Sequence, residues 1–329
     1  MNLLQVTPAG HDATSFYRAV GVFGHLQKIM PDLWISTFNQ RDFQGSWPEL
    51  IFYDVIFMQR PVTPDAKKVI LQAKEMGKKV WIDYDDDYQD IPPENPVFRM
   101  YKGEKVKKNI IEICKLADVI TVTTKKLVKN FGKYNANVRH IPNAFNDYIF
   151  KPEPKKYTDV VFWRGSDSHQ DDMLPFVPEQ KRLIRKYEKI KWAFMGHYPR
   201  RLHHDKIHHI ESVETIKYFK YVQQLAPKCV HVPLLDKNFN HCKSNIAAIE
   251  GALAGSVIVA PAWDEWNIPG VMLYNSPEEY GQNIEAIIRG EVDIKKLNTL
   301  TWNYISDNLL LSKVNKQRVD IINELLNHD

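Results

Sequence analysis

The chain has 329 residues, 44% of them hydrophobic and 26% charged, a composition typical of a globular protein with room for two domains of about 150 residues each. It has no run of about 18 apolar residues, no basic stretch followed by a long apolar core at its start, and no cysteine spacing typical of a metal site or a disulfide framework, so we expect a cytoplasmic protein without a membrane-spanning helix or a signal peptide. The net charge of +4 is compatible with a phosphate-rich partner but does not require one.

The first half of the chain alternates short apolar runs with amphipathic stretches. The apolar runs are typical of buried parallel strands, and stretches with apolar residues three or four positions apart are typical of helices that cover a sheet. We predict strands at Asn2–Thr7, Leu33–Phe38, Val55–Met58, Lys79–Tyr84, Val119–Val122 and Val138–Ile141. We predict helices at Ser15–Met30, Asp65–Met76, Lys105–Ala117 and Thr123–Phe131.

A polar, proline-rich segment, Pro142–Tyr157, interrupts this alternation and indicates a domain boundary. Beyond it we predict strands at Asp159–Trp163, Trp192–Met195, Ile207–Ile210, Val230–Pro233, Val257–Ala260 and Val271–Tyr274. We predict helices at Gln180–Lys189, Thr215–Leu225, Lys243–Ala254 and Pro277–Arg289, followed by two helices or one bent helix at Thr301–Leu326. The expected organisation is a first domain at 1–145, a linker at 146–157, a second domain at 158–300 and C-terminal helices at 301–329.

The alternation of strands and helices also predicts the fold class. Strands joined by helices form right-handed βαβ units and therefore parallel sheets. We expect an α/β protein with two Rossmann-like, doubly wound domains that face each other across a cleft. Because ligands of such sheets bind at the carboxyl ends of the strands, the site residues should lie in the loops that follow strands.

The segment Asn240–Trp263 is predicted to be a helix that leads into a strand. Lys243 and Ser244 stand at the predicted start of the helix, where free backbone N–H groups and the helix dipole favour an anion. Glu250 lies seven residues further along, about 10 Å along the helix axis. This arrangement predicts one groove for a nucleotide diphosphate, with the phosphates at the helix start and the ribose hydroxyls on Glu250.

A second candidate for phosphate binding is the loop after the first strand of the second half. Arg164 can make a forked contact with a phosphate, and Gly165 and Ser166 let the backbone come close to it. The alternative is a tight turn between a strand and a helix.

Acidic residues gather at the end of the fourth predicted strand. Asp83 and Asp85 point the same way if they continue the strand, and Asp86 follows them. Carboxylates this close repel each other unless a cation, a hydroxyl-rich ligand or basic side chains relieve them. The cluster therefore indicates an acceptor-side or catalytic role, a metal site, or a solvated acidic loop.

The segment Asn240–Trp263, the loop Arg164–His169 and the run Pro142–Asn146 together resemble the retaining glycosyltransferases of the GT-B fold, close to the large family-four group. The resemblance implies a final helix that crosses back onto the first domain, a nucleotide diphosphate sugar such as a UDP-sugar as donor, transfer with retention, and no required cofactor or metal. The sequence departs from the commonest family pattern at Cys242, where a Glu eight positions before Glu250 is usual.

The resemblance also assigns roles to residues. Those expected to support catalysis are Arg164, Lys243, Asp83 and Asp85. Those expected to bind the donor are Gly165, Ser166, Gly196, His197, Asn240, Ser244, Asn245 and Glu250. Those expected to bind the acceptor are Gly10, His11, Asp12 and Asp86, with Tyr17 and Arg18 nearby as a packed aromatic ring and a surface charge.

Several alternatives remain open at this level. The acceptor is expected to be a saccharide or glycan, but a hydroxylated base in double-stranded DNA also suits a compact, basic chain. A non-catalytic nucleotide-sugar-binding protein and an epimerase of the same fold are further alternatives. The chain has no GxGxxG after its first strand, no P-loop, no HExxH and no CxxC, which argues against nicotinamide redox chemistry, ATP-dependent phosphoryl transfer and zinc hydrolysis.

Overall fold

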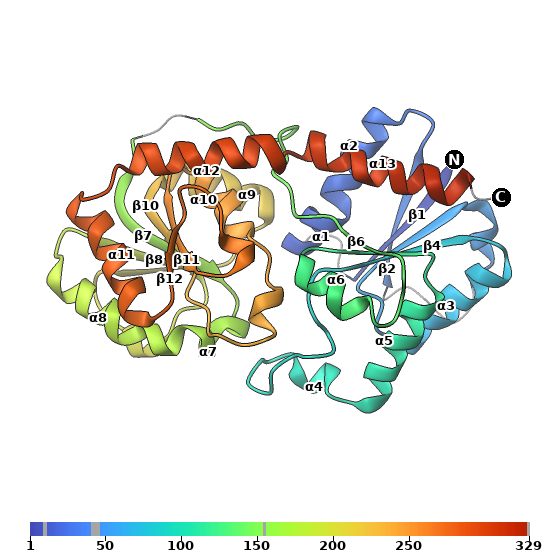
Figure 1. Ribbon diagram of the computed structural model, residues 1–329, viewed down its shortest axis with the longest axis horizontal. Helices are drawn as coiled ribbons and strands as arrows, with labels where there is room; N and C mark the ends of the chain where they lie inside the picture. The colour runs from blue at the N-terminus through green and yellow to red at the C-terminus, as the bar shows by residue number, and fades with distance from the viewer. Residues whose placement is uncertain (9–11, 41–46, 154–155, 328–329) are drawn as a thin grey trace.

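The computed structural model describes residues 1–8, 12–40, 47–153 and 156–327 and contains two six-stranded parallel sheets (Figure 1). The first sheet has the order β2-β1-β3-β4-β5-β6 and the second has the order β12-β11-β10-β7-β8-β9. The strands of the first sheet are β1 (Asn2–Thr7), β2 (Trp34–Asn39), β3 (Val55–Gln59), β4 (Lys79–Tyr84), β5 (Val119–Val122) and β6 (Val138–His140). Those of the second are β7 (Thr158–Gly165), β8 (Lys191–Gly196), β9 (Ile207–Ile210), β10 (Pro227–His231), β11 (Val257–Pro261) and β12 (Met272–Tyr274). The predicted α/β fold with two doubly wound sheets is confirmed.

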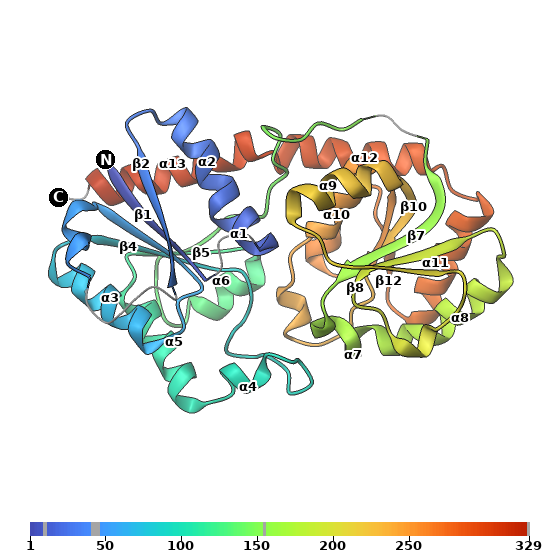
Figure 2. The ribbon, with the colours of Figure 1, turned by 180° about the vertical axis from the view of Figure 1, so that it is seen from behind.

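Helices cover both faces of each sheet, as Figures 1 and 2 show. Those of the first half are α1 (Ala13–Arg18), α2 (Val20–Ile29), α3 (Pro64–Glu75), α4 (Phe98–Tyr101), α5 (Glu104–Leu116) and α6 (Lys125–Phe131). Those of the second half are α7 (Gln170–Met173), α8 (Val177–Lys186), α9 (Thr215–Leu225), α10 (Ile246–Leu253) and α11 (Pro277–Arg289). The chain ends in α12 (Ile294–Asn308) and α13 (Leu311–Asn327), and no helix in the described part of the chain is long and apolar enough to cross a membrane.

Local chemistry explains where several helices begin. Thr63 caps α3 and Ser276 caps α11, each accepting a hydrogen bond from a backbone N–H three residues later. In both helices a proline occupies the first turn, where its missing N–H would have no helical partner. The start of α11 at Pro277 was predicted from the sequence, whereas α3 was expected to start one residue later, at Asp65.

Three predicted helices differ most clearly from the structure, and a fourth, expected at Gln180–Lys189, lies three residues earlier, at Val177–Lys186. The single helix expected at Ser15–Met30 is broken at Ala19, where the backbone leaves the helical region (φ −130°, ψ −95°). The helix expected from Lys243 begins only at Ile246, because Lys243 is extended (φ −70°, ψ 134°) after a short 3-10 turn. The C-terminal stretch forms two helices that start earlier than expected. At the break between them, Phe145 N–H donates to the Leu309 carbonyl at 2.7 Å and the Phe145 carbonyl accepts from Leu311 N–H at 2.8 Å.

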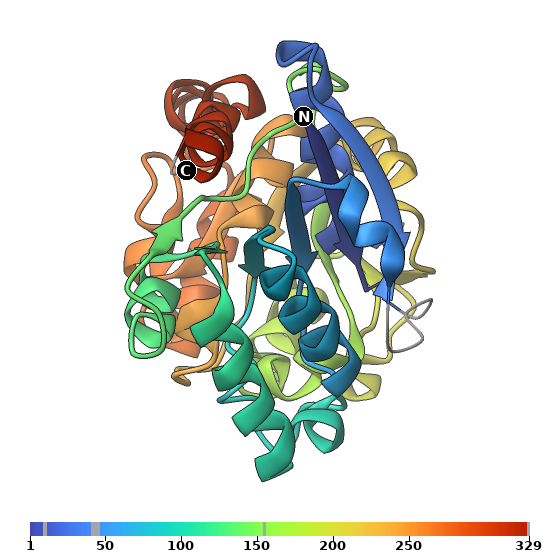
Figure 3. The same cartoon turned by 90° about the vertical axis from the view of Figure 1, so that its right-hand side faces the viewer.

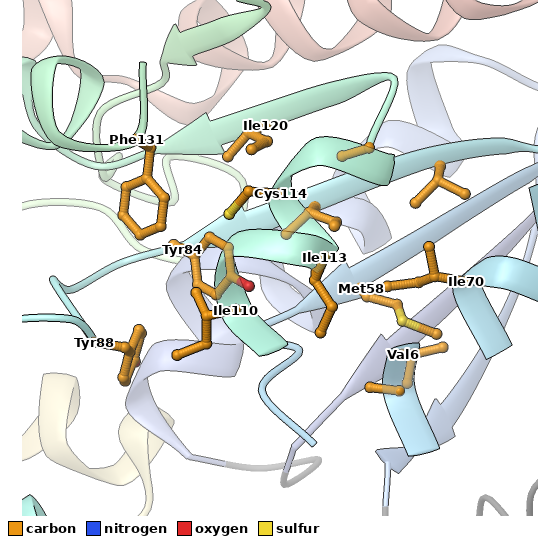
Figure 4. Packing of buried hydrophobic residues seen from close by; sticks show 14 of the residues in the cluster. Val6, Met58, Ile70, Tyr84, Tyr88, Ile110, Ile113, Cys114, Ile120 and Phe131 are labelled. Atoms are coloured by element: carbon orange, nitrogen blue, oxygen red, sulfur yellow. The ribbon is translucent and has the colours of Figure 1, made fainter. Parts of the chain in front are cut away.

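One of the apolar clusters of the first half lies between its sheet and the helices α3 and α5. Figure 4 shows Met58 from β3 and Ile70 from α3 at one end of this cluster, with Ile113 and Cys114 from α5 in its middle. Tyr84 stacks on Phe131 with ring centroids 4.7 Å apart, and its hydroxyl donates to the Pro61 carbonyl at 2.7 Å. This packing holds the carboxyl end of β4 in a defined place.

The C-terminal helices run along one side of both halves (Figures 1 and 3). Helix α12 packs on α10 of the second half, whereas α13 packs on α2 of the first. Asn315 of α13 is fully buried and donates to the Val22 carbonyl at 3.0 Å, and Ile322 joins the apolar cluster formed by Phe23 and Leu26. The final helix therefore crosses back onto the first half, as the resemblance implied.

Candidate active site

A cavity of about 470 Å³ lies between the two halves. It is lined by residues at or just beyond the carboxyl ends of strands from both sheets, which is where parallel sheets bind ligands. The first half contributes Asp85 and Asp86 after β4, and the second half contributes Arg164 from β7 and His231 from β10. We take this cavity as the candidate active site.

Lys243 and Asp86 form an ion pair across the cavity, joining the two halves. Lys243 Nζ lies 2.7 Å from Asp86 Oδ2, and each side chain is 20% exposed. Lys243 also lies over the ring of Phe239, 4.4 Å from its centroid. Beside it, Asn143 donates to Ser244 Oγ at 2.8 Å. The structure thus places Lys243 and Ser244 in the lining of the cavity, on the loop that leads into α10.

Arg164 and Glu250 form a forked ion pair at the same cavity. Arg164 Nε donates to Glu250 Oε2 at 2.8 Å, and Nη2 donates to Oε1 at 2.5 Å. Burial on its own would lower the pKa of Arg164, but the Glu250 carboxylate raises it above its ordinary value. Arg164 is therefore a permanent cation in the cavity.

Two tyrosine hydroxyls complete the surroundings of Glu250. Tyr17 of α1 donates to Oε1 at 3.0 Å, and Tyr218 of α9 donates to Oε2 at 2.9 Å. Burial first, and then the neighbouring Glu250 charge, raise the pKa of both tyrosines well above the ordinary value, so both remain proton donors. Sequence reasoning missed both roles, because Tyr17 comes from the other half of the chain and Tyr218 occupies an ordinary buried helix position.

Asp85 is held by a second arginine. Arg60 Nε and Nη2 donate to the two oxygens of Asp85 at 2.6 and 2.5 Å, and the Tyr88 hydroxyl donates to Oδ1 at 2.8 Å. Burial would raise the pKa of Asp85, but Arg60 lowers it, and the net shift is downward. The pKa of Asp86 is raised, chiefly by burial and further by Asp85, although Lys243 opposes the shift. The two neighbouring carboxyls therefore differ in how readily they ionise.

The structure places Asp83, which was predicted to support catalysis, outside the cavity lining. Asp83 is 2% exposed, does not line the cavity, and accepts from Arg18 Nε at 3.0 Å and from Arg18 Nη2 at 2.6 Å. Thr121 donates to its Oδ2 at 2.6 Å. Arg18 is likewise buried, not the surface charge that we expected. The physical reason is that Asp83 is still within the sheet, whereas Asp85 is beyond its end.

Five of the predicted donor-binding residues do not line the cavity: Gly165, Gly196, His197, Asn240 and Asn245. Gly196 has φ +91°, and a Cβ there would come within 2.3 Å of the Gly165 carbonyl oxygen, so this glycine allows two strands to approach closely. Asn240 donates to Asp172 Oδ1 at 2.6 Å, and Asn245 occupies the N-cap position of α10. Ser166 lines the cavity, as does Glu250.

The predicted acceptor loop is only partly described. Gly10 and His11 lie outside the described residues. Asp12 caps α1 by accepting from Ser15 N–H at 2.6 Å, and it borders a second cavity of about 550 Å³ instead of the first. Asp86, the remaining predicted acceptor residue, lines the main cavity.

Three buried polar atoms in the lining have no hydrogen-bond partner among the described residues: His231 Nε2, Trp266 Nε1 and Asp86 Oδ1. Burial lowers the pKa of His231 to about 3, so its ring is neutral near pH 7, and its Nδ1 lies 2.9 Å from the Tyr280 hydroxyl. Sequence reasoning missed His231 and Trp266. The available signal for His231 was its place at the end of an apolar strand. Within the described residues, no group of three or more His, Cys, Asp or Glu side chains is arranged to hold a metal ion.

Two Rossmann-like sheets that face a cavity, with a final helix crossing from the second half to the first, define the GT-B fold. A glycosyltransferase structure from Rickettsia africae matches all of this chain and 99% of its own length, with a TM-score of 0.67 and 14% identity. The Anabaena HepE structure in complex with UDP matches over 98% of this chain and 100% of its own, with a TM-score of 0.65 and 13% identity. A structure from Listeria monocytogenes described as a putative UDP-N-acetylglucosamine 2-epimerase matches over 100% of this chain and 97% of its own length, with a TM-score of 0.61 and 11% identity. No family profile and no curated protein sequence matches the chain.

Proposed function

We propose that the protein is a glycosyltransferase that moves a sugar from a nucleotide diphosphate sugar, specifically a UDP-sugar, to an acceptor hydroxyl. The observation that carries the proposal is that two cations from the second half, Arg164 and Lys243, line one cavity at the carboxyl ends of its strands. A departing diphosphate needs positive charge that is already in position when the glycosidic bond breaks. The glycosyltransferase and HepE–UDP structures of the same fold support this choice.

In this proposal Lys243 exchanges Asp86 for the diphosphate. Among the described residues, the carboxylate paired with the ammonium group is that of Asp86, and the pKa of this carboxyl is already raised. The loop just before α10 adds Ser244 and the free N–H groups of the helix start, which favour an anion. Arg164, at the end of β7, would contact the same diphosphate.

The wall of the cavity in the first half suits a saccharide acceptor. It presents the rings of Tyr88 and Tyr101 next to Asp85, Asp86 and Arg60. Flat apolar rings beside charged hydrogen-bonding groups match a sugar, which has apolar ring faces and polar hydroxyls. Retention of the anomeric configuration is proposed from the resemblance, and NMR of the product measures it directly.

The experiment is a thermal-shift panel with UDP-, GDP-, ADP-, CDP- and TDP-sugars, followed by turnover of the best donor with and without EDTA. A ligand that binds only the folded chain raises its melting temperature, and the rise is larger for a tighter ligand at the same concentration. We expect a UDP-sugar to give the largest shift, and turnover to be lost in Lys243→Ala. Binding without any turnover would instead indicate a non-catalytic nucleotide-sugar binder, and release of an epimerised free sugar without an acceptor would indicate an epimerase.

A second candidate acceptor, a hydroxylated base in double-stranded DNA, is favoured by one surface feature. Residues 97–108, which include α4 and the start of α5, carry five basic side chains and one acidic side chain, a net charge of +4 that equals that of the whole chain. Val97 and Tyr101 of this region line the cavity, together with Asn95 and Pro96 just before it. DNA binding should weaken steeply between low and moderate salt, by orders of magnitude if many phosphates are contacted. Affinity independent of salt would exclude this acceptor.

A further inference from the structure

The carboxylate of Glu250 is saturated with hydrogen bonds. A carboxylate has about four lone-pair sites. Two nitrogens of Arg164 and the hydroxyls of Tyr17 and Tyr218 donate to the two oxygens, all within 3.0 Å. Glu250 is 2% exposed, so water cannot replace a lost donor easily. A ribose hydroxyl could bind this carboxylate only by displacing a donor that is already buried.

Arg164 is oriented by the same contacts. The fork to Glu250 uses its Nε and Nη2 and fixes the plane of the guanidinium group. The ring of Tyr218 lies 5.3 Å from the guanidinium carbon, which restricts the group from a second side. The side chain is 27% exposed where it lines the cavity. The exposed part of the guanidinium group is therefore available to a ligand.

Tyr17 connects this arrangement to the other half of the protein. It is 2% exposed on α1, and its ring packs against Phe219 of α9 with centroids 6.1 Å apart. Its hydroxyl reaches Glu250 from a residue 233 positions away in the sequence. The orientation of Arg164 thus depends on a contact between the two halves.

We propose that Glu250 is a positioning residue that aims Arg164 at the diphosphate and does not bind the ribose, and that Tyr17 and Tyr218 are the groups that hold Glu250 in place. This inference rests on the proposed function, because it assumes that the cavity takes a nucleotide diphosphate. It differs from the sequence-based prediction, in which Glu250 contacts the ribose.

The test is calorimetric binding of UDP, uridine, 2′-deoxy-UDP and 3′-deoxy-UDP to the wild type and to Glu250→Gln, Tyr17→Phe and Tyr218→Phe. We expect each Tyr→Phe change to weaken UDP binding by roughly three- to tenfold, the range of one lost hydrogen bond, and to leave uridine binding unchanged. The wild type should bind the two deoxy analogues as it binds UDP. In an Arg164→Ala background, Tyr17→Phe should have no further effect on UDP binding, because the two changes act through one group.

Tyr221→Phe is the matched control, because Tyr221 lies on the same helix, α9, and no hydrogen bond joins it to Glu250 in the described part of the chain. Thermal unfolding of each variant shows whether it folds, and the tyrosine variants keep the test decisive if Glu250→Gln does not fold. A deoxy analogue that binds at least tenfold more weakly than UDP, with the difference lost in Glu250→Gln, would overturn the inference alone. A wild-type chain that binds none of the nucleotide diphosphates would overturn the proposed function as well.

Discussion

Arg18 and Asp83 form an ion pair buried in the first half, with Arg18 Nη2 2.6 Å from Asp83 Oδ2 and side chains that are 1% and 2% exposed. The guanidinium group also donates to the Ile141 carbonyl at 2.6 Å, so the pair ties α1 to β4 and to the segment that follows β6. Asp83 lies near the end of β4, two residues before Asp85 in the loop that follows the strand. Arg18 lines the cavity, whereas Asp83 does not, so Asp83 supports the cavity through Arg18.

Replacing Asp83 with alanine should destabilise the fold by about 3–5 kcal/mol, because Arg18 would be left buried without its counter-charge. Urea unfolding measures the change. Asp65→Ala is the control, since Asp65 pairs with Lys68 on an exposed helix surface and its loss should change little. A stably folded Asp83→Ala protein that had lost turnover would instead support the predicted catalytic role of Asp83.

Lys243→Ala should weaken UDP binding about tenfold or more, a loss of about 1.4 kcal/mol or more, because a charge-assisted contact to the diphosphate is removed. Uridine, which has no phosphate, should bind the variant as it binds the wild type. Calorimetry with both ligands separates the two contributions. Lys237→Ala is the control from the same loop, since Lys237 pairs with Glu94 and lies outside the cavity lining. Equal losses for UDP and uridine would mean that Lys243 shapes the site without meeting the phosphates.

Glu265→Gln should stabilise the protein at neutral and higher pH but not in acid. Burial raises the pKa of Glu265 in the folded state to about 7, against an ordinary value of 4.5. The folded chain therefore keeps a proton that the unfolded chain loses, and the stability present below pH 4.5 is lost as the pH rises through 7. Glutamine does not ionise, so the variant should gain roughly 1–3 kcal/mol above pH 7.

Thermal or urea unfolding between pH 4 and pH 8 measures the difference between Glu265→Gln and the wild type. The gain should be close to zero at pH 4 and level off above pH 7. The neighbouring Asp264→Asn provides the control, because Asp264 is exposed. A gain that did not change with pH would point to packing instead of ionisation.

Ile322→Ala should destabilise the protein by about 2–5 kcal/mol, because it opens a cavity where α13 packs on the first half. The comparison is Leu300→Ala on α12, where the side chain is 40% exposed and little contact is lost. Equal effects of the two changes on the free energy of unfolding would mean that α13 docks only weakly.

Much of the fold could be predicted from local patterns. Apolar runs such as Val55–Met58 and Val257–Ala260 form central strands, as predicted. Helices cover both faces of such a parallel strand, so its side chains are apolar on both faces. Ser276 and Pro277 marked the start of α11 because capping depends on neighbours in the chain. The break between α1 and α2 was missed, since no glycine or proline at Ala19 signals it.

The residues of the candidate site could be predicted only in part from local sequence patterns. The sequence by itself determined that Lys243, Arg164 and Asp86 would follow strands or precede a helix near the carboxyl ends of parallel sheets. Only the tertiary structure decided which charges meet: Asp83 with Arg18, Asp85 with Arg60, and Glu250 with Arg164, Tyr17 and Tyr218. The physical reason is range. Strand and helix periodicity is set by residues a few positions apart, whereas the partner of a buried charge is set by packing between segments 25 to 233 positions apart.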